Sequence, residues 1–420
     1  MKFFILLILA FFLIFSPVFA QESLDWDIDT VFDEPPPENN QNQPETPIET
    51  TPEEGTADVL SSLIRRRGLT FNASYSFLAG ISPGWQEVPW YDGENEFSWG
   101  QRANMRASFN VDAQISEVFR VKTVVYFRIP YFKFTLGDFF FDYNLLDAVF
   151  FRAGKFNTYW GISPNYSFAN LLSRVPMGSR VREAYYIKTD IPIGVGGLQL
   201  LIQTRAYLMG GDIPGWLNLG YGAKYNLALR WADFDLGVFY HNDMPFRGFF
   251  SIKTTLGNTE LYNEYLGSGF DDIKNFSGAV SLGVLQDFFD GKFSVNGEVF
   301  YNAENAAYFY EEETDISDAK ISPYIDGLNL ALNLVYRFSG KGSPRAFIQA
   351  KYAPMERTAR LVPGFRFTPF RHTELYIAVP MALGEREGFY YSSTPDIDNR
   401  PFCVVLLLTI RGAVRAGYNY

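Results

Sequence analysis

The chain has 420 residues, of which 47% are hydrophobic and 18% aromatic, and Cys403 is its single cysteine. One cysteine excludes an intramolecular disulfide, so the fold must be stabilised in another way. The formal charge of -11 excludes the basic surface of a nucleic-acid-binding protein, and we expect no nucleic-acid partner.

The first twenty residues have the features of a secretory signal peptide. One cation, Lys2, precedes an uninterrupted apolar run from Phe3 to Phe15, and Val-Phe-Ala ends at Ala20. The run is short for a membrane-spanning helix, and a small residue stands where cleavage is expected. We therefore expect residues 1–20 to be removed and the mature chain to be exported.

Residues 21–58 form an acidic, Pro-rich segment. They contain 12 acidic residues and no Lys or Arg, and they include the sequence FDEPPPENNQNQPETP. Such a composition cannot bury enough apolar surface to offset the entropy lost on ordering. We expect a disordered periplasmic segment, with an acidic docking segment as the alternative. The rest of the chain is close to neutral.

From residue 59 onward, apolar and polar residues alternate in segments separated by turn residues. In Leu69–Gly80 (LTFNASYSFLAG) only Leu78 breaks the alternation, and we place Leu78 near the outer rim. The alternation is complete over Gln101–Ser116. A period of two indicates strands with one apolar and one polar face, and a series of such strands is typical of a transmembrane barrel. Further segments of this kind are 198–205, 221–231, 293–301 and 328–338.

The connections between these segments are a second indication of a barrel. Short ones such as Phe289–Lys292 mostly alternate with long ones such as Ala303–Gly327. This alternation is expected of tight periplasmic turns and longer extracellular loops. We predict that residues 59–420 form an all-β, transmembrane antiparallel β-barrel of about 18 strands. The number falls to 16 if Phe132–Tyr143 is not a strand.

The C-terminal residues also alternate, and the chain ends in aromatic residues of one parity, Tyr418 and Tyr420. A final amphipathic strand ending in an aromatic residue resembles the terminal signal of Gram-negative-type outer-membrane β-barrel proteins. The resemblance implies an outer-membrane location, contact with the lipid bilayer and recognition by the barrel-assembly machinery. The aromatic content suits aromatic girdles at the two membrane interfaces.

One connection carries a more specific pattern. Residues 152–172 read RAGKFNTYWGISPNYSFANLL, with Gly-Lys, Trp-Gly and Ser-Pro in succession. This resembles a pattern found in porin-like outer-membrane families. The resemblance implies a loop that folds inward and narrows the pore, with Lys155, Trp160 and Gly161 near the constriction. The alternative is an ordinary extracellular loop with a packed Trp.

If the apolar face of each strand contacts lipid, the polar face lines the lumen. Acidic residues are few on the lumen side and include Asp112, Asp190, Glu298 and Glu374. The electrostatic field of the lumen could therefore favour anionic solutes. Alternatively, the charges pair with one another across neighbouring strands and only hydrate the lumen. The lumen and selectivity candidates are Arg102, Arg106, Lys122, Arg128, Arg152, Lys155, Arg205, Lys224 and Arg230.

The sequence contains no recognisable catalytic motif. His241 and His372 are far apart in the chain, and no Gly-rich phosphate loop or Cys cluster occurs. We expect no enzymatic activity, cofactor or metal site. The favoured function is a porin-like channel for passive diffusion of small polar solutes, with anionic solutes as the candidate class. The alternatives are a fatty-acid-transporter-like barrel for apolar ligands and a non-conducting surface barrel for adhesion or host contact.

Overall fold

The computed structural model of the protein describes residues 68–85, 96–130, 132–166, 168, 169, 171, 172, 185–204, 219–241, 244–269, 277–303, 325–339, 343–385, 388, 390 and 400–419. The expectations for residues 1–58, Arg205 and Tyr420 therefore lie outside the described residues. Among the residues described, no helix has both the length and the apolar character needed to cross a bilayer.

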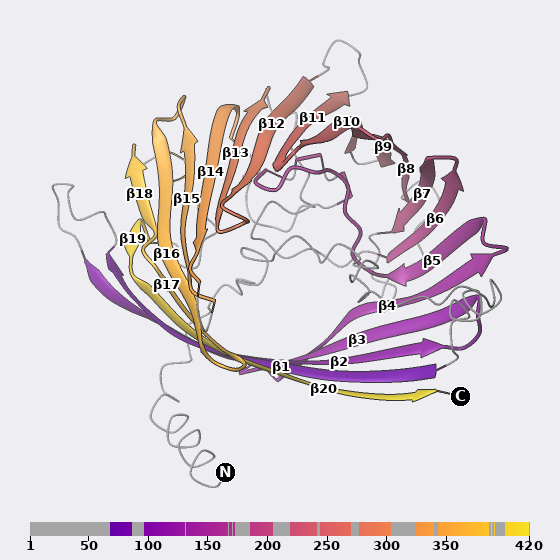
Figure 1. The fold of residues 1–420 in the computed structure, drawn as a ribbon, viewed down its shortest axis with the longest axis horizontal. Helices are drawn as coiled ribbons and strands as arrows, with labels where there is room; N and C mark the ends of the chain where they lie inside the picture. Colours follow the sequence, from indigo (N-terminus) through magenta and orange to yellow (C-terminus); the bar gives the residue numbers. More distant parts are fainter. Residues whose placement is uncertain are drawn as a thin grey trace, which may run out of the picture.

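The described chain is all-β and forms one antiparallel sheet that closes on itself where β20 pairs with β1 (Figure 1). The strands are β1 (Gly68–Trp85), β2 (Phe97–Gln114), β3 (Phe119–Ile129), β4 (Lys133–Leu145), β5 (Val149–Lys155), β6 (Tyr185–Ile193), β7 (Gly196–Thr204), β8 (Gly220–Ala228), β9 (Asp233–His241), β10 (Met244–Leu256), β11 (Thr259–Gly269), β12 (Ser277–Phe288), β13 (Phe293–Asn302), β14 (Gly327–Arg337), β15 (Arg345–Ala353), β16 (Thr358–Phe370), β17 (Thr373–Ala378), β18 (Met381–Gly384), β19 (Phe402–Cys403) and β20 (Val405–Asn419).

These segments make a closed barrel of 18 strands. The short strands β17 and β18 both pair with β16, and β19 and β20 both pair with β1. Each couple is therefore one barrel strand with a break, at Val379-Pro380 and at Val404. Pro380 has no N–H for the ladder, which accounts for the first break. The fourth strand, β4, is present, so the prediction of 18 strands is confirmed and the alternative of 16 is wrong.

One rim of the barrel carries only short turns. The chain enters β1 and leaves β20 at this rim, as predicted for a barrel with both ends on the periplasmic side. The turn at 289–292 is tight because Phe289, Asp290 and Gly291 have φ values of 55°, 56° and 78°. The opposite rim carries the longer connections, although three connections there are short: β3 to β4 by three residues, β9 to β10 by two and β15 to β16 by four.

The two faces of the strands differ as the alternation predicts. On β1, Phe71 and Tyr75 point outward and are 42% and 46% exposed, whereas Ser82 points inward and is 5% exposed. Outward-facing apolar side chains suit a lipid environment. At the seam between β1 and β20, Tyr75 lies across Gly412, where an added Cβ would come within 2.5 Å of the ring.

Leu78 differs from its expectation. It faces inward, is 9% exposed, and belongs to a buried apolar cluster with Tyr376 and Leu407. The inner wall between β15 and β1 is thus apolar at this level. Leu78 therefore breaks the alternation because the inward face needs an apolar residue there, and not because it lies at a rim where the faces are equivalent.

Candidate functional site in the barrel interior

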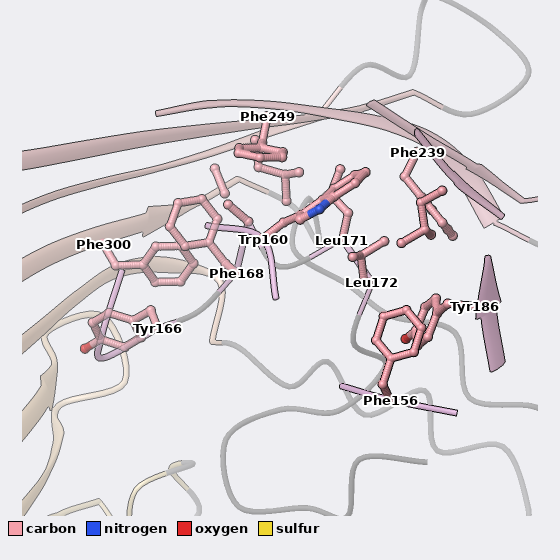
Figure 2. Close-up of a cluster of buried hydrophobic side chains, with 14 of the residues drawn as sticks. Phe156, Trp160, Tyr166, Phe168, Leu171, Leu172, Tyr186, Phe239, Phe249 and Phe300 are labelled. Atoms are coloured by element: carbon pink, nitrogen blue, oxygen red, sulfur yellow. The ribbon is translucent and has the colours of Figure 1, made fainter. Parts of the chain in front are cut away.

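The connection between β5 and β6 folds into the barrel. We call residues 156–172 the inner loop; residues 167 and 170 are not among those described. Figure 1 shows its trace inside the ring of strands, and Figure 2 shows its side chains against the wall. The ring centroid of Trp160 lies 6.0 Å from that of Phe249 on β10, and Phe168 lies 4.8 Å from Phe300 on β13.

The apolar side chains of the inner loop are buried against the wall. Trp160 is 1% exposed, Phe168 is fully buried, and both belong to one large cluster with wall residues. Burying one large apolar side chain contributes about 1.5–3 kcal/mol, so several together hold the loop firmly. At Gly222 on β8, an added Cβ would lie 2.7 Å from the Trp160 ring, so a larger residue there would displace it.

Glu264 on β11 holds the backbone of the inner loop. Its carboxylate accepts hydrogen bonds from the backbone N–H of Ile162 and, at 3.1 Å, from that of Ser163. Gly161 makes this possible: its φ is +99°, and a Cβ would lie 3.0 Å from Glu264 Oε1. Hydrogen bonds to a carboxylate are about twice as strong as neutral ones.

A second carboxylate, Glu298 on β13, holds the next residues. It accepts hydrogen bonds from Ser163 Oγ, from the Asn165 backbone N–H at 3.1 Å and from Asn165 Nδ2 at 3.0 Å. The Tyr262 hydroxyl donates a further bond at 3.1 Å. Glu298 is only 3% exposed, and these donors replace the water that its charge loses on burial.

Trp160 connects the inner loop to charged residues of the wall. Its indole Nε1 donates to Gln199 Oε1 at 2.5 Å, and Gln199 Nε2 donates to Asp190 at 2.8 Å. Asp190 also pairs with Lys188 at 2.9 Å. The polar edge of Trp160 is thus part of a hydrogen-bonded chain across β6 and β7, while its ring packs in the apolar cluster.

The predicted constriction residues anchor the inner loop. Lys155 is 6% exposed and donates to the backbone oxygen of Leu136 on β4. Gly154 has a φ of +132°, and a Cβ there would collide with the backbone of Phe139. The structure therefore places Lys155, Trp160 and Gly161 at the root and along the wall side of the loop. A narrowing of the pore by this loop stays a prediction.

Some of the predicted lumen cations lie at the same level on neighbouring strands of the inner wall. Arg106 on β2 is in direct register with Arg128 on β3 and, on its other side, with Ser76 on β1. Ser76 is in register with Arg411 on β20. The closed barrel thus brings three arginines to one level of its inner wall. On β2, Arg102 precedes Arg106 by two inward-facing positions.

Other predicted cations have acidic neighbours. Arg152 donates to both carboxylate oxygens of Asp142 and lies 4.3 Å above the Phe140 ring, which Lys122 approaches at 5.8 Å. Arg230 differs from its expectation, because it is exposed in the short turn between β8 and β9 and not on a strand.

The inward-facing ion pairs lie in the part of the barrel that is next to the short turns. Most of them join two strands connected by a short turn, which supports the alternative that lumen charges pair across strands. The ion pairs are Arg120–Asp112, Arg152–Asp142, Lys188–Asp190, Lys224–Asp235, Lys253–Glu260 and Arg366–Glu374.

Two residues of this site were missed by sequence reasoning. Glu264 lies on the inward parity of β11, but an isolated acid on a strand gives no signal of a partner a hundred residues away. The sequence placed Arg411 on the polar face of the last strand. That it shares a level with Arg106 depends on how the barrel closes, because Ser76 of β1 lies between them.

Solved structures with the same architecture are known. The chain is similar to OpdL of Pseudomonas aeruginosa (11% identity, 83% of this chain and 99% of that chain, TM-score 0.52). It is also similar to OccD3 (OpdP) of the same organism (11% identity, 82% and 91%, TM-score 0.51) and to its OpdQ (8% identity, 83% and 98%, TM-score 0.51).

No protein-family model matches the chain, and no match is found among curated protein sequences. The structural likenesses, at this level of identity, show a shared fold. The chain thus has the fold of a porin-like outer-membrane β-barrel, which is the fold that the sequence predicted.

Proposed function

We propose that this protein is an outer-membrane channel through which small polar solutes diffuse, with a preference for anions. The solved structures that share its fold are outer-membrane channels, and its outward-facing side chains are apolar. A barrel with a polar inward parity and an apolar outward parity provides a hydrated path across a membrane.

The observation that carries the anion preference is the level shared by Arg106, Arg128 and Arg411. The inner loop contacts the wall on strands from β4 to β15, including Asn333 of β14, which donates to Asn165 at 2.6 Å, and Lys351 of β15, which lies 5.7 Å from the Tyr166 ring centre. The three arginines lie instead on β20, β2 and β3. The loop thus leaves the arginine side of the interior uncovered by those contacts. A solute passing the loop would move along a basic surface, which attracts anions.

The rest of the chain supports export and assembly. We propose that residues 1–20 direct secretion and are cleaved, that residues 21–58 form a disordered periplasmic segment, and that Tyr418 and Tyr420 form part of the assembly signal. The lipid bilayer and the barrel-assembly machinery are the partners that this function requires.

The deciding experiment is conductance in planar bilayers. The protein is refolded in detergent, its folding is verified by heat-modifiable migration, and the reversal potential is measured under a tenfold KCl gradient. Discrete ohmic steps with chloride more permeant than potassium are expected. Potassium preference would overturn the anion assignment, and absence of steps from folded protein would overturn the channel in favour of ligand transport or adhesion.

A further inference from the structure

The guanidinium of Arg106 lies over an aromatic ring of the neighbouring strand. Its Cζ is 4.0 Å from the centroid of the Tyr126 ring on β3. Arg106 is in register with Arg128, and Tyr126 with Ser108, so the arginine reaches the ring along the diagonal between β2 and β3. Long and aromatic side chains can touch along such diagonals, and an aromatic face attracts a cation within about 6 Å of its centroid.

The contact draws Arg106 away from a second cation. Arg106 and Arg128 stand directly opposite each other, and like charges in that position repel and destabilise a sheet. Because β3 runs from the short-turn rim towards the opposite rim, Tyr126 lies nearer the short turns than Arg128 does. By leaning onto the Tyr126 ring, the guanidinium of Arg106 turns away from the position of Arg128 while it stays on the inner wall.

The ring holds the arginine without opposing its charge. Elsewhere on the inner wall, Arg152 lies 4.3 Å from the centroid of the Phe140 ring but also pairs with Asp142 at 2.6 Å. A carboxylate partner cancels the charge that a passing anion would feel, whereas a neutral ring fixes the cation and adds no negative charge. Tyr126 therefore supports Arg106 and preserves the basic character of its level.

The wall leaves room for the Tyr126 ring at Gly137 of β4. A Cβ added at Gly137 would collide with the edge of the ring at Cε2 and Cδ2. The register between β3 and β4 shifts at this point, so that Gly137 and Asp138 together face Val124. Such a β-bulge bends a strand locally and re-aims its side chains. The place of the Tyr126 ring is thus built into the backbone of the next strand.

Arg106 and Tyr126 are both only partly buried, so the guanidinium stays accessible from the barrel interior while the ring holds it. An arginine presents its N–H donors in a planar fork, and a fork that is already oriented loses less conformational entropy when an anion binds. Both conditions for attracting anions, an accessible charge and a fixed orientation, therefore meet at this pair.

We propose that Tyr126 is a positioning residue for the anion preference, which holds the Arg106 guanidinium in one orientation on the lumen surface. The proposal rests on the proposed channel function. Gly137 contributes indirectly, because it leaves the space that the Tyr126 ring needs in order to lie against Arg106. Loss of the ring face frees the guanidinium, and the attraction that it exerts on a passing anion is then averaged over several orientations.

The test compares Tyr126→Leu, Tyr126→Phe and the control Tyr301→Leu, in which an outward-facing tyrosine that is 48% exposed is removed. Reversal potentials under a KCl gradient give the permeability ratio of chloride to potassium. This ratio should fall about threefold in Tyr126→Leu. It should stay unchanged in Tyr126→Phe, which keeps the ring face, and in Tyr301→Leu. Equal ratios in Tyr126→Leu and the unchanged protein, with all variants heat-modifiable, would overturn the proposal.

A second variant moves the ring without removing it. Gly137→Ala should displace Tyr126 and lower the permeability ratio as Tyr126→Leu does. The control is Gly297→Ala on β13, where the nearest atom to an added Cβ is Val284 Cγ1 at 3.7 Å. If Tyr126→Leu does not fold, Gly137→Ala decides the question. Equal ratios in Gly137→Ala and Gly297→Ala would then overturn the proposal.

A second readout does not require conduction. In detergent-solubilised protein with ¹⁵N-labelled arginine, the Nε–Hε resonance of Arg106 is assigned as the one that Arg106→Lys removes. The ring current of Tyr126 should shift this resonance upfield in the unchanged protein and in Tyr126→Phe, but not in Tyr126→Leu. If the shift appears but the unchanged protein shows no chloride preference, the anion assignment fails while the contact stands. If chloride is preferred equally with and without the ring, the positioning role fails alone.

Discussion

Glu298 on β13 accepts two hydrogen bonds from Asn165 of the inner loop, at 3.1 Å from the backbone N–H and at 3.0 Å from Nδ2. The two residues are more than 130 positions apart in the chain. Together with Glu264, which accepts bonds from Ile162 and Ser163, Glu298 holds the long connection between β5 and β6 in the barrel interior.

Replacing Glu298 by Ala should release the middle of the inner loop. Each buried donor left unsatisfied costs about 1–3 kcal/mol. The backbone N–H of Asn165 would lose its acceptor, and its Nδ2 would keep only the bond to Asn296 Oδ1 at 3.3 Å. We expect amide exchange at residues 163–166 to accelerate by about tenfold or more, and single-channel current to become noisier. Glu260→Ala is the matched control, since Glu260 is an inward acid of β11 that pairs with Lys253. Identical amide exchange in both variants would show that Glu298 does not hold the inner loop in place.

Replacing Gly161 by Ala should displace the inner loop from Glu264. The φ of +99° is strained for alanine, by about 1–3 kcal/mol, and the new Cβ would also crowd Glu264 Oε1. The control Gly194→Ala places an alanine at an existing positive φ of 58° in a short turn, with nothing within 4 Å of the Cβ. We expect altered conductance and faster chymotryptic cleavage in the inner loop, which contains aromatic residues but no Lys or Arg, for Gly161→Ala only. An effect of equal size in both variants would show that strain alone is responsible.

Replacing Arg106 by Glu should reverse part of the anion preference. The substitution changes the charge by two units at the level shared with Arg128 and Arg411, so a passing anion meets a weaker attraction. The reversal potential under a KCl gradient should move toward potassium selectivity. Arg337→Glu, at a residue bonded to the turn oxygen of Gly291, is the rim control and should move the potential less.

Alkaline pH should loosen the packing of Tyr390, a buried residue between β18 and β19, against Ile325 and Ala353. Burial raises the pKa of Tyr390 to about 12, and the ordinary value for a tyrosine is about 10. Because the folded-state pKa is raised, the stabilisation is fully present below pH 10 and is lost as the pH rises toward 12. Difference absorbance at 295 nm between the unchanged protein and Tyr390→Phe should show one tyrosine that ionises near pH 12. Ionisation near pH 10 would place Tyr390 in water.

Removing the C-terminal Tyr420 should impair assembly of the barrel in the cell. If the terminal aromatic residue is read by the assembly machinery, the truncated chain should accumulate less heat-modifiable protein in the outer-membrane fraction. The same truncation should refold in detergent as well as the full chain does, which separates recognition from stability. Equal outer-membrane levels would remove Tyr420 from the assembly signal.

The fold was accessible from the sequence because strand patterns are local. Alternation in segments such as Leu69–Gly80 reports which side chains face lipid, and turn residues report where strands end. The fourth strand could be proposed because short and long connections alternate strictly only if Phe132–Tyr143 is a strand, although a count of 16 stayed open. The inner loop was accessible only through its resemblance to porin-like families, and its partners Glu264 and Glu298 were not.

The sequence by itself determined an exported, alternating chain with a lipid-compatible face and a polar face, because a period of two is written into neighbouring residues. Only the tertiary structure decided which distant residues meet. Closure of β20 on β1 brings Arg411 to the level of Arg106, and folding of the inner loop brings Gly161 to Glu264. These contacts depend on register and curvature accumulated over many strands, which no local pattern encodes.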